Sequence, residues 1–216
     1  MLFFAPIGIY LFNIDFYDRL YDQNGVYEKL NKDEVLSMTK KIFSFFRYGD
    51  DLDGHIRYAD ESRSSVAFFT ENEIDHMVDV RNLIFKILIL FYVSIVAVIV
   101  FIALLLLLER KHSKRFKGTG LVFVISSSVV LFLFIILYIL SMNFSSLFDN
   151  FHLIFFPQGN FMFDANSLLI TLFPFNFFYQ YFTRLVTGSI ILSFIFLFIG
   201  ILLLNIHKFF RKRIQH

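Results

Sequence analysis

His76 and Asp79 lie three residues apart in the segment Glu73-Ile-Asp-His-Met-Val-Asp-Val-Arg81, just before a long apolar run. On a helix, residues at this spacing share a face, so the Asp79 carboxylate can orient the imidazole and fix its tautomer. The simpler interpretation is a solvated polar collar at a helix start, where acidic side chains interact favourably with the helix dipole. Spacing alone favours that simpler interpretation.

A second histidine occurs in the segment Asp149-Asn-Phe-His152-Leu-Ile-Phe-Phe-Pro-Gln-Gly-Asn160. Because its near neighbours are mostly apolar, we expect a neutral imidazole. The simpler interpretation of His152 is an interfacial histidine that is hydrogen-bonded to the backbone. Neither histidine is a strong candidate by itself, and a shared site depends on the elements that position the two side chains.

The composition indicates a membrane protein: 57% of the 216 residues are hydrophobic, including 33 Phe, and these residues gather in long runs that are almost free of charge. Three runs, 83–108, 121–142 and 185–206, exceed the ~20 apolar residues that a spanning helix needs. A helix over Leu2–Phe12 would rise only about 17 Å. We therefore predict four transmembrane helices, of which the first, within residues 1–13, is short.

The basic residues predict the orientation of these spans. Lys and Arg crowd residues 109–120 and the tail 207–216, whereas Asn143–Thr183 contains neither. The positive-inside rule places both basic segments in the cytoplasm, so residues 14–82 and 143–184 are expected on the extracytoplasmic face of a cell membrane. Local basic clusters beside apolar runs are typical of membrane topology and argue against nucleic acid as a partner.

This topology brings His76 and His152 to the same side of the membrane. Two imidazoles are suited to moving protons at neutral pH, one as base and the other as acid. Two histidines together with Asp79 or Asp149 could instead bind zinc. Neither spacing matches a compact metal motif such as HExxH, so a metal site is the second choice.

Residues 14–82 are predicted to form a small, mostly helical domain. Asn31 and Glu34 have capping-box spacing. The apolar residues that follow them repeat at helical spacing: Val35, Met38, Ile42, Phe45 and Phe46. Gly49 through Gly54 is expected to end this helix.

Two irregular stretches complete the outer face. His55–Phe69 is expected to be a loop, with room for a short strand pair. Asp51-Leu-Asp53-Gly54 resembles part of a calcium loop, but an acidic turn is the preferred interpretation because the first and twelfth ligand positions do not match. Phe151–Phe182 is rich in Phe yet interrupted by Pro157, Gly159 and Pro174. It is predicted to line the interface without forming one continuous helix.

The two histidine segments resemble the signatures of a known family. Thr70-Glu-Asn-Glu-Ile-Asp-His-Met-Val-Asp-Val-Arg-Asn-Leu83 is similar to its "E…HM.DVK.L" motif, and Phe151-His-Leu-Ile-Phe-Phe-Pro-Gln-Gly-Asn-Phe-Met-Phe-Asp164 is similar to "FHEIFFPGGNWLFD". That family is the lipoprotein intramolecular transacylases, which have four spans capped by an outer domain. The order of spans and outer segments agrees over nearly the whole chain.

The resemblance implies an all-α integral membrane acyltransferase. Members move the sn-2 acyl chain of a diacylglyceryl-cysteine lipoprotein onto the α-amine of the same cysteine, which gives a lyso-form lipoprotein. The family's catalytic histidines fall on His76 and His152. No cofactor or metal is implied, and the expected partners are the diacylated lipoprotein and membrane lipid, with the enzyme a monomer.

Several positions depart from the family pattern: Leu153 replaces Glu, Phe161 replaces Trp, Gln158 replaces Gly and Arg81 replaces Lys. Asp79 is a candidate supporting residue, and Asn160 with the backbone near Gly159 are candidate donors to the oxyanion. Two alternatives stay open at this stage. One is a non-enzymatic membrane assembly or interaction protein, and the other is a zinc-dependent membrane hydrolase.

Overall fold

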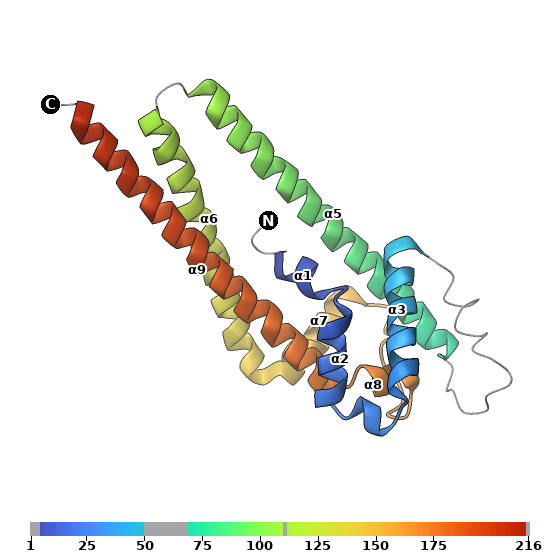
Figure 1. The fold of residues 1–216 in the computed structure, drawn as a ribbon. Helices are drawn as coiled ribbons and strands as arrows, with labels where there is room; N and C mark the ends of the chain where they lie inside the picture. Colours follow the sequence, from blue (N-terminus) through green and yellow to red (C-terminus); the bar gives the residue numbers. More distant parts are fainter. Residues whose placement is uncertain (1–4, 50–68, 110–111, 215–216) are drawn as a thin grey trace. The chain divides into compact units, whose positions relative to one another are not determined.

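The computed structural model describes residues 5–49, 69–109 and 112–214, and within them it contains helices and no strands. Figure 1 shows their course along the chain. The elements are α1 (Ala5–Tyr10), α2 (Ile14–Gln23), η1 (Val26–Glu28), α3 (Lys32–Tyr48), α5 (Glu71–Leu108), α6 (His112–Leu140), η2 (Ser141–Asn143), α7 (Phe144–Phe155), α8 (Leu168–Leu172) and α9 (Phe175–Ile214). The expected strand pair within His55–Phe69 and the acidic turn Asp51–Gly54 fall outside the described residues, except for Phe69.

Three helical stretches are long and apolar enough to cross a membrane: Glu71–Leu105, Lys114–Phe155 and Phe175–Ile206. These stretches correspond to the three long apolar runs of the sequence. The prediction of a helical membrane protein is therefore confirmed for three spans. The described part of the short first span is α1, a helix of 6 residues. The fourth span therefore stays a prediction.

The chain divides into two compact units, of which the first comprises Met1–Gly8, Ile89–Met142 and Arg184–His216. Within it, α6 and α9 approach closely at two glycines. A Cβ atom added to Gly120 would lie 3.0 Å from the Gly200 carbonyl oxygen, and one added to Gly200 would lie 2.9 Å from the Val124 nitrogen. Small residues allow such backbone contact, which supplies van der Waals packing where lipid gives no hydrophobic driving force.

The second unit comprises Ile9–Leu88 and Asn143–Thr183, and it has an aromatic core. The predicted face of α3 is confirmed, since Val35, Ile42 and Phe45 are buried in this core. Asn31 also caps α3 as expected, because its side-chain oxygen accepts hydrogen bonds from the backbone of Asp33 and Glu34. The buried residues of this core are Phe16, Tyr17, Leu20, Tyr21, Val26, Val35, Ile42, Phe43, Phe45, Phe69, Met77, Leu168, Leu172 and Phe177.

The Phe-rich segment Phe151–Phe182 does not form one continuous helix, as the sequence predicted. α7 ends at Phe155, irregular backbone follows, α8 spans only 5 residues, and α9 begins after Pro174. Phe156 and Leu172 are nevertheless buried. Leu172 belongs to the core of the second unit, whereas Phe156 is buried against the rings of His76 and His152.

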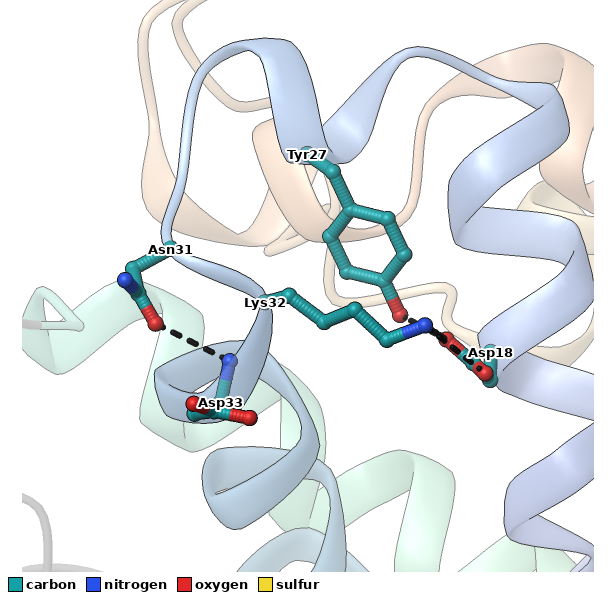
Figure 2. A network of polar contacts seen from close by, with 5 residues as sticks. All are labelled: Asp18, Tyr27, Asn31, Lys32 and Asp33. Atoms are coloured by element: carbon teal, nitrogen blue, oxygen red, sulfur yellow. Dashed lines mark hydrogen bonds and ion pairs between the residues drawn. The ribbon is translucent and has the colours of Figure 1, made fainter.

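A polar cluster joins α2 to the start of α3 (Figure 2). Asp18 accepts a 2.5 Å hydrogen bond from the Tyr27 hydroxyl and pairs with Lys32 at 2.9 Å. The Tyr27 hydrogen bond, followed by the Lys32 ammonium, holds the pKa of Asp18 below its ordinary value. The cluster stabilises the folded state only while the Asp18 carboxylate is ionised.

Replacing Tyr27 by Phe is expected to lower the free energy of unfolding at neutral pH by up to about 1 kcal/mol, because the bond is partly exposed. A depressed folded-state pKa gives stabilisation that is complete above the unfolded value of about 3.9 and disappears as the pH falls through the lower folded value. The difference between wild type and Y27F should therefore vanish on acidification. Chemical unfolding followed by circular dichroism in detergent measures it, with the exposed Tyr48→Phe as control.

Candidate active site

The helix that carries His76 begins with a capping box at Thr70-Glu-Asn-Glu73. The Glu73 Oε2 atom accepts hydrogen bonds from the Thr70 backbone N–H at 2.7 Å and from its hydroxyl at 3.0 Å. In return, the Glu73 backbone N–H donates to the Thr70 hydroxyl at 3.3 Å. This reciprocal arrangement satisfies donors that a helix start otherwise leaves unpaired, so α5 starts at a defined residue.

Glu73 also connects two helices. Its Oε1 atom accepts a 2.8 Å hydrogen bond from the backbone N–H of Leu169, in the first turn of α8. The side chain is 1% exposed, so among the described residues these donors take the place of water around the carboxyl group. Sequence reasoning missed this role of Glu73, although the Thr-x-x-Glu pattern was the available signal.

His76 follows Glu73 by three residues and is 6% exposed. Its ring lies edge-on to Phe156, with 4.8 Å between centroids, and to Phe163, at 5.4 Å. Burial among aromatic rings favours the neutral imidazole over the charged form. His76 Nδ1 is buried without a hydrogen-bond partner.

α7 fixes the tautomer of His152. Its Nδ1 atom lies 2.8 Å from the carbonyl oxygen of Phe148, one turn earlier. A carbonyl oxygen only accepts hydrogen bonds, so Nδ1 must carry the proton, and in the neutral ring Nε2 is then the basic nitrogen. The Phe148 and Phe161 rings also pack against the His152 ring, with distances between ring centroids of 4.2 Å and 5.1 Å.

The structure brings the two predicted histidines together. Their ring centroids are 6.0 Å apart and the rings are nearly parallel, with an interplanar angle of 22°. Phe156, only 2% exposed, contacts both rings. Two titratable imidazoles at this separation can both reach one small reacting group lying beside them.

Asp79 contacts the loop that follows α7. Its Oδ2 atom accepts hydrogen bonds from Gln158 Nε2 at 2.5 Å and from Asn160 Nδ2 at 2.7 Å. Asn160 in turn interacts with His76. The charge of Asp79 also acts on the imidazole directly, and the predicted supporting role of this carboxylate stays a prediction. Gln158, which replaces the family's usual Gly, was not expected to take part.

Gly159 shapes the same loop. It adopts a left-handed backbone conformation with φ of 78°, and open space surrounds the position of its missing Cβ atom. Glycine is needed there for its conformation and not for close packing. The Gly159 N–H donates to the Phe156 carbonyl oxygen at 3.1 Å, so this amide already has a partner.

The described residues hold no group of three or more His, Asp or Glu side chains arranged to share a metal ion. Asp149, considered as a possible third ligand, lies exposed on α7. The histidine pair is thus accompanied by amides and aromatic rings in the part of the chain that the structure describes.

A model of the lipoprotein intramolecular transacylase (Lit) family matches residues 1–178, a range that contains both histidine segments. The chain belongs to the lipoprotein intramolecular transacylase family. Its fold is similar to the in meso structure of the membrane-integral transacylase Lit from Bacillus cereus, with a TM-score of 0.61 and 18% identity over 99% of this chain and 90% of that chain. No curated protein sequence matches the chain.

Membership of the lipoprotein intramolecular transacylase family makes this chain a membrane acyltransferase of a family that acts on lipoproteins. The similarity to the Bacillus cereus protein shows a shared membrane-integral fold.

Replacing Glu73 by Gln is expected to destabilise the protein by about 1–3 kcal/mol, because buried donors lose their acceptor. Both carboxylate oxygens accept hydrogen bonds, whereas Gln has one oxygen and would turn an NH2 group toward a donor. Thermal unfolding in detergent measures the loss. The matched control is Glu71→Gln, an exposed acid in the same turn, and equal melting temperatures for the two variants would contradict the assigned role.

Proposed function

We propose that this protein moves the sn-2 acyl chain of a diacylglyceryl-cysteine lipoprotein to the α-amine of the same cysteine. The observation that carries the proposal is the pair of imidazoles, His76 and His152, whose ring centroids are 6.0 Å apart with Phe156 against both rings. Proton transfer at two neighbouring points is what an ester-to-amide transfer requires. The family match supports acyl transfer as the reaction class.

The proposed reaction begins with the α-ammonium group of the lipidated cysteine. Its pKa of about 7.7–8 lets one imidazole remove a proton near neutral pH. The amine nitrogen then attacks the carbonyl carbon of the sn-2 ester and forms a tetrahedral intermediate. As the nitrogen attacks, it loses a second proton to the second imidazole, which passes this proton to the glycerol oxygen when the bond between that oxygen and the carbonyl carbon breaks.

The acyl donor and the acyl acceptor of this reaction are both supplied by one substrate molecule. An ester becomes an amide and an alcohol, no water is consumed, and the two imidazoles recover their starting states by exchanging protons with solvent. Donor and acceptor belong to the same molecule, so positioning supplies much of the rate advantage. A single copy of the enzyme therefore suffices.

The oxyanion of the intermediate needs a hydrogen-bond donor. Of the two predicted candidates, the Gly159 amide already donates to Phe156. Asn160 Nδ2 carries two hydrogens and donates one of them to Asp79. We therefore assign the remaining Asn160 hydrogen to the oxyanion.

We further propose that the reaction occurs on the extracytoplasmic face. The basic segments 109–120 and 207–216 hold the opposite side in the cytoplasm. Residues 14–82 then form a small outer domain, and 143–184 lies at the interface. The substrate reaches the histidines from the surrounding membrane lipid, because its acyl chains are in the bilayer.

His76→Gln and His152→Gln are each expected to reduce acyl transfer by about 10²–10⁴-fold, the usual contribution of a general acid or base. Mass spectrometry of lipopeptides from cells that make diacylated lipoprotein and express each variant measures the N-acyl, lyso-form product. His112→Gln, within the basic cytoplasmic segment, is the control and should retain activity.

Two outcomes of this experiment would refute the proposal. The first is a wild-type chain that leaves the acyl group on the glycerol. The second is a His76→Gln, His152→Gln double variant that is made at normal levels and still transfers the chain. A membrane protein that acts only through binding would tolerate both substitutions.

The natural sequence contains no cysteine, which allows a direct test of orientation. A single cysteine at exposed Ser145 is expected to react with a membrane-impermeant maleimide in intact cells, whereas one at exposed Lys117 should react only after lysis. The reverse labelling pattern would place the histidines on the cytoplasmic face.

A further inference from the structure

The orientation of the Asn160 amide is determined by its partner. Asn160 Nδ2 lies 2.7 Å from the Asp79 carboxylate, and an ionised carboxylate accepts hydrogen bonds without donating them. The nitrogen must therefore face Asp79, which fixes the direction of the Asn160 carbonyl oxygen. This removes the usual ambiguity between the two ends of a side-chain amide.

Two buried polar atoms beside this contact have no partner: Asn160 Oδ1 and His76 Nδ1. Leaving a buried donor or acceptor unpaired costs about 1–3 kcal/mol. The two residues that carry these atoms interact with each other. An amide oxygen only accepts, so these two atoms can satisfy each other in one way only, with a hydrogen on His76 Nδ1 donated to Asn160 Oδ1.

We propose that Asn160 is a positioning residue for His76, and that Asp79 acts on the imidazole by holding the Asn160 amide. With its hydrogen on Nδ1, the neutral His76 ring exposes Nε2 as its basic nitrogen. His152 has the same tautomer, imposed by the Phe148 carbonyl oxygen. Both histidines thus exchange protons through Nε2 in the reaction proposed above, on which the catalytic part of this inference rests.

Gln158 provides a matched comparison within the same cluster. Its amide donates to the same Asp79 oxygen as Asn160 does, at 2.5 Å, but the side chain is exposed on the loop. Removing Gln158 deletes one hydrogen bond of Asp79 and leaves the bond to Asn160. A Gln158 variant therefore tests the loss of one hydrogen bond to Asp79, whereas an Asn160 variant also tests the proposed interaction with His76.

The tautomer of a neutral imidazole is visible in its ¹⁵N chemical shifts. Protein labelled with ¹⁵N-histidine, purified in detergent and studied above the pH of imidazole protonation, contains 6 histidines, and His76→Gln identifies the signals of interest. We expect wild-type His76 to carry its proton on Nδ1. Asn160→Leu and Asp79→Asn should shift it toward Nε2, and Gln158→Ala should leave it on Nδ1.

Asp79→Asn is the second variant because it changes almost no volume, so folding is preserved where the Leu substitution disturbs the loop. An Asn side chain at position 79 both donates and accepts hydrogen bonds, so either end of the Asn160 amide can face it. A wild-type His76 protonated on Nε2, or a tautomer that both variants leave unchanged, would overturn the inference. A change of equal size in Gln158→Ala would show a general effect on the loop and would overturn it as well.

Activity separates this inference from the proposed function. Asn160→Leu also removes the donor assigned to the oxyanion, so the activity test uses Asp79→Asn, which keeps the Asn160 side chain. Asp79→Asn should lower kcat for acyl transfer by about 10–100-fold, as loss of the outer hydrogen-bond partner of a metal-bound histidine does, with little change in KM. A tautomer shift in a protein without acyl transfer would refute the proposed function and retain the positioning role. Acyl transfer by a protein in which these variants leave the His76 tautomer unchanged would support the proposed function and refute the positioning role.

Discussion

The buried carboxylate of Glu73 sets the position of the candidate site. A charge with 1% exposure must have its hydrogen bonds supplied by the protein, and here Thr70 and Leu169 supply them. Because these donors belong to the starts of α5 and α8, the two helices are held together at one point. His76 follows within a single turn of α5, so its place depends on this contact.

Aromatic packing and hydrogen bonds both contribute to the surroundings of the two histidines. Phenylalanine rings contact both imidazoles, whereas the Nδ1 atom of His152 has a hydrogen-bond partner and that of His76 is buried without one. His152 is oriented from within its own helix, through Phe148. His76 has no such partner for Nδ1 in its own helix, and we propose that Asn160 fills this role.

Local sequence signals predicted the features that depend on near neighbours. The Asn31 cap and the buried face of α3 were confirmed because both arise within one helix. The interruption after Phe155 was likewise predictable from Pro157 and Gly159, which disfavour continued helix. Glu73 was overlooked, although its capping pattern with Thr70 is equally local. Its bond to Leu169, 96 residues away, has no sequence signature.

The sequence by itself determined that this is a membrane protein of the transacylase family, since apolar runs and the two histidine segments are properties of the linear chain. Only the tertiary structure decided that the two imidazoles lie 6.0 Å apart, and that Asp79 bonds to Gln158 and Asn160, which are 79 and 81 residues distant. The physical reason is range: spacing along a helix fixes which residues share a face, but contacts between distant segments depend on how whole elements pack.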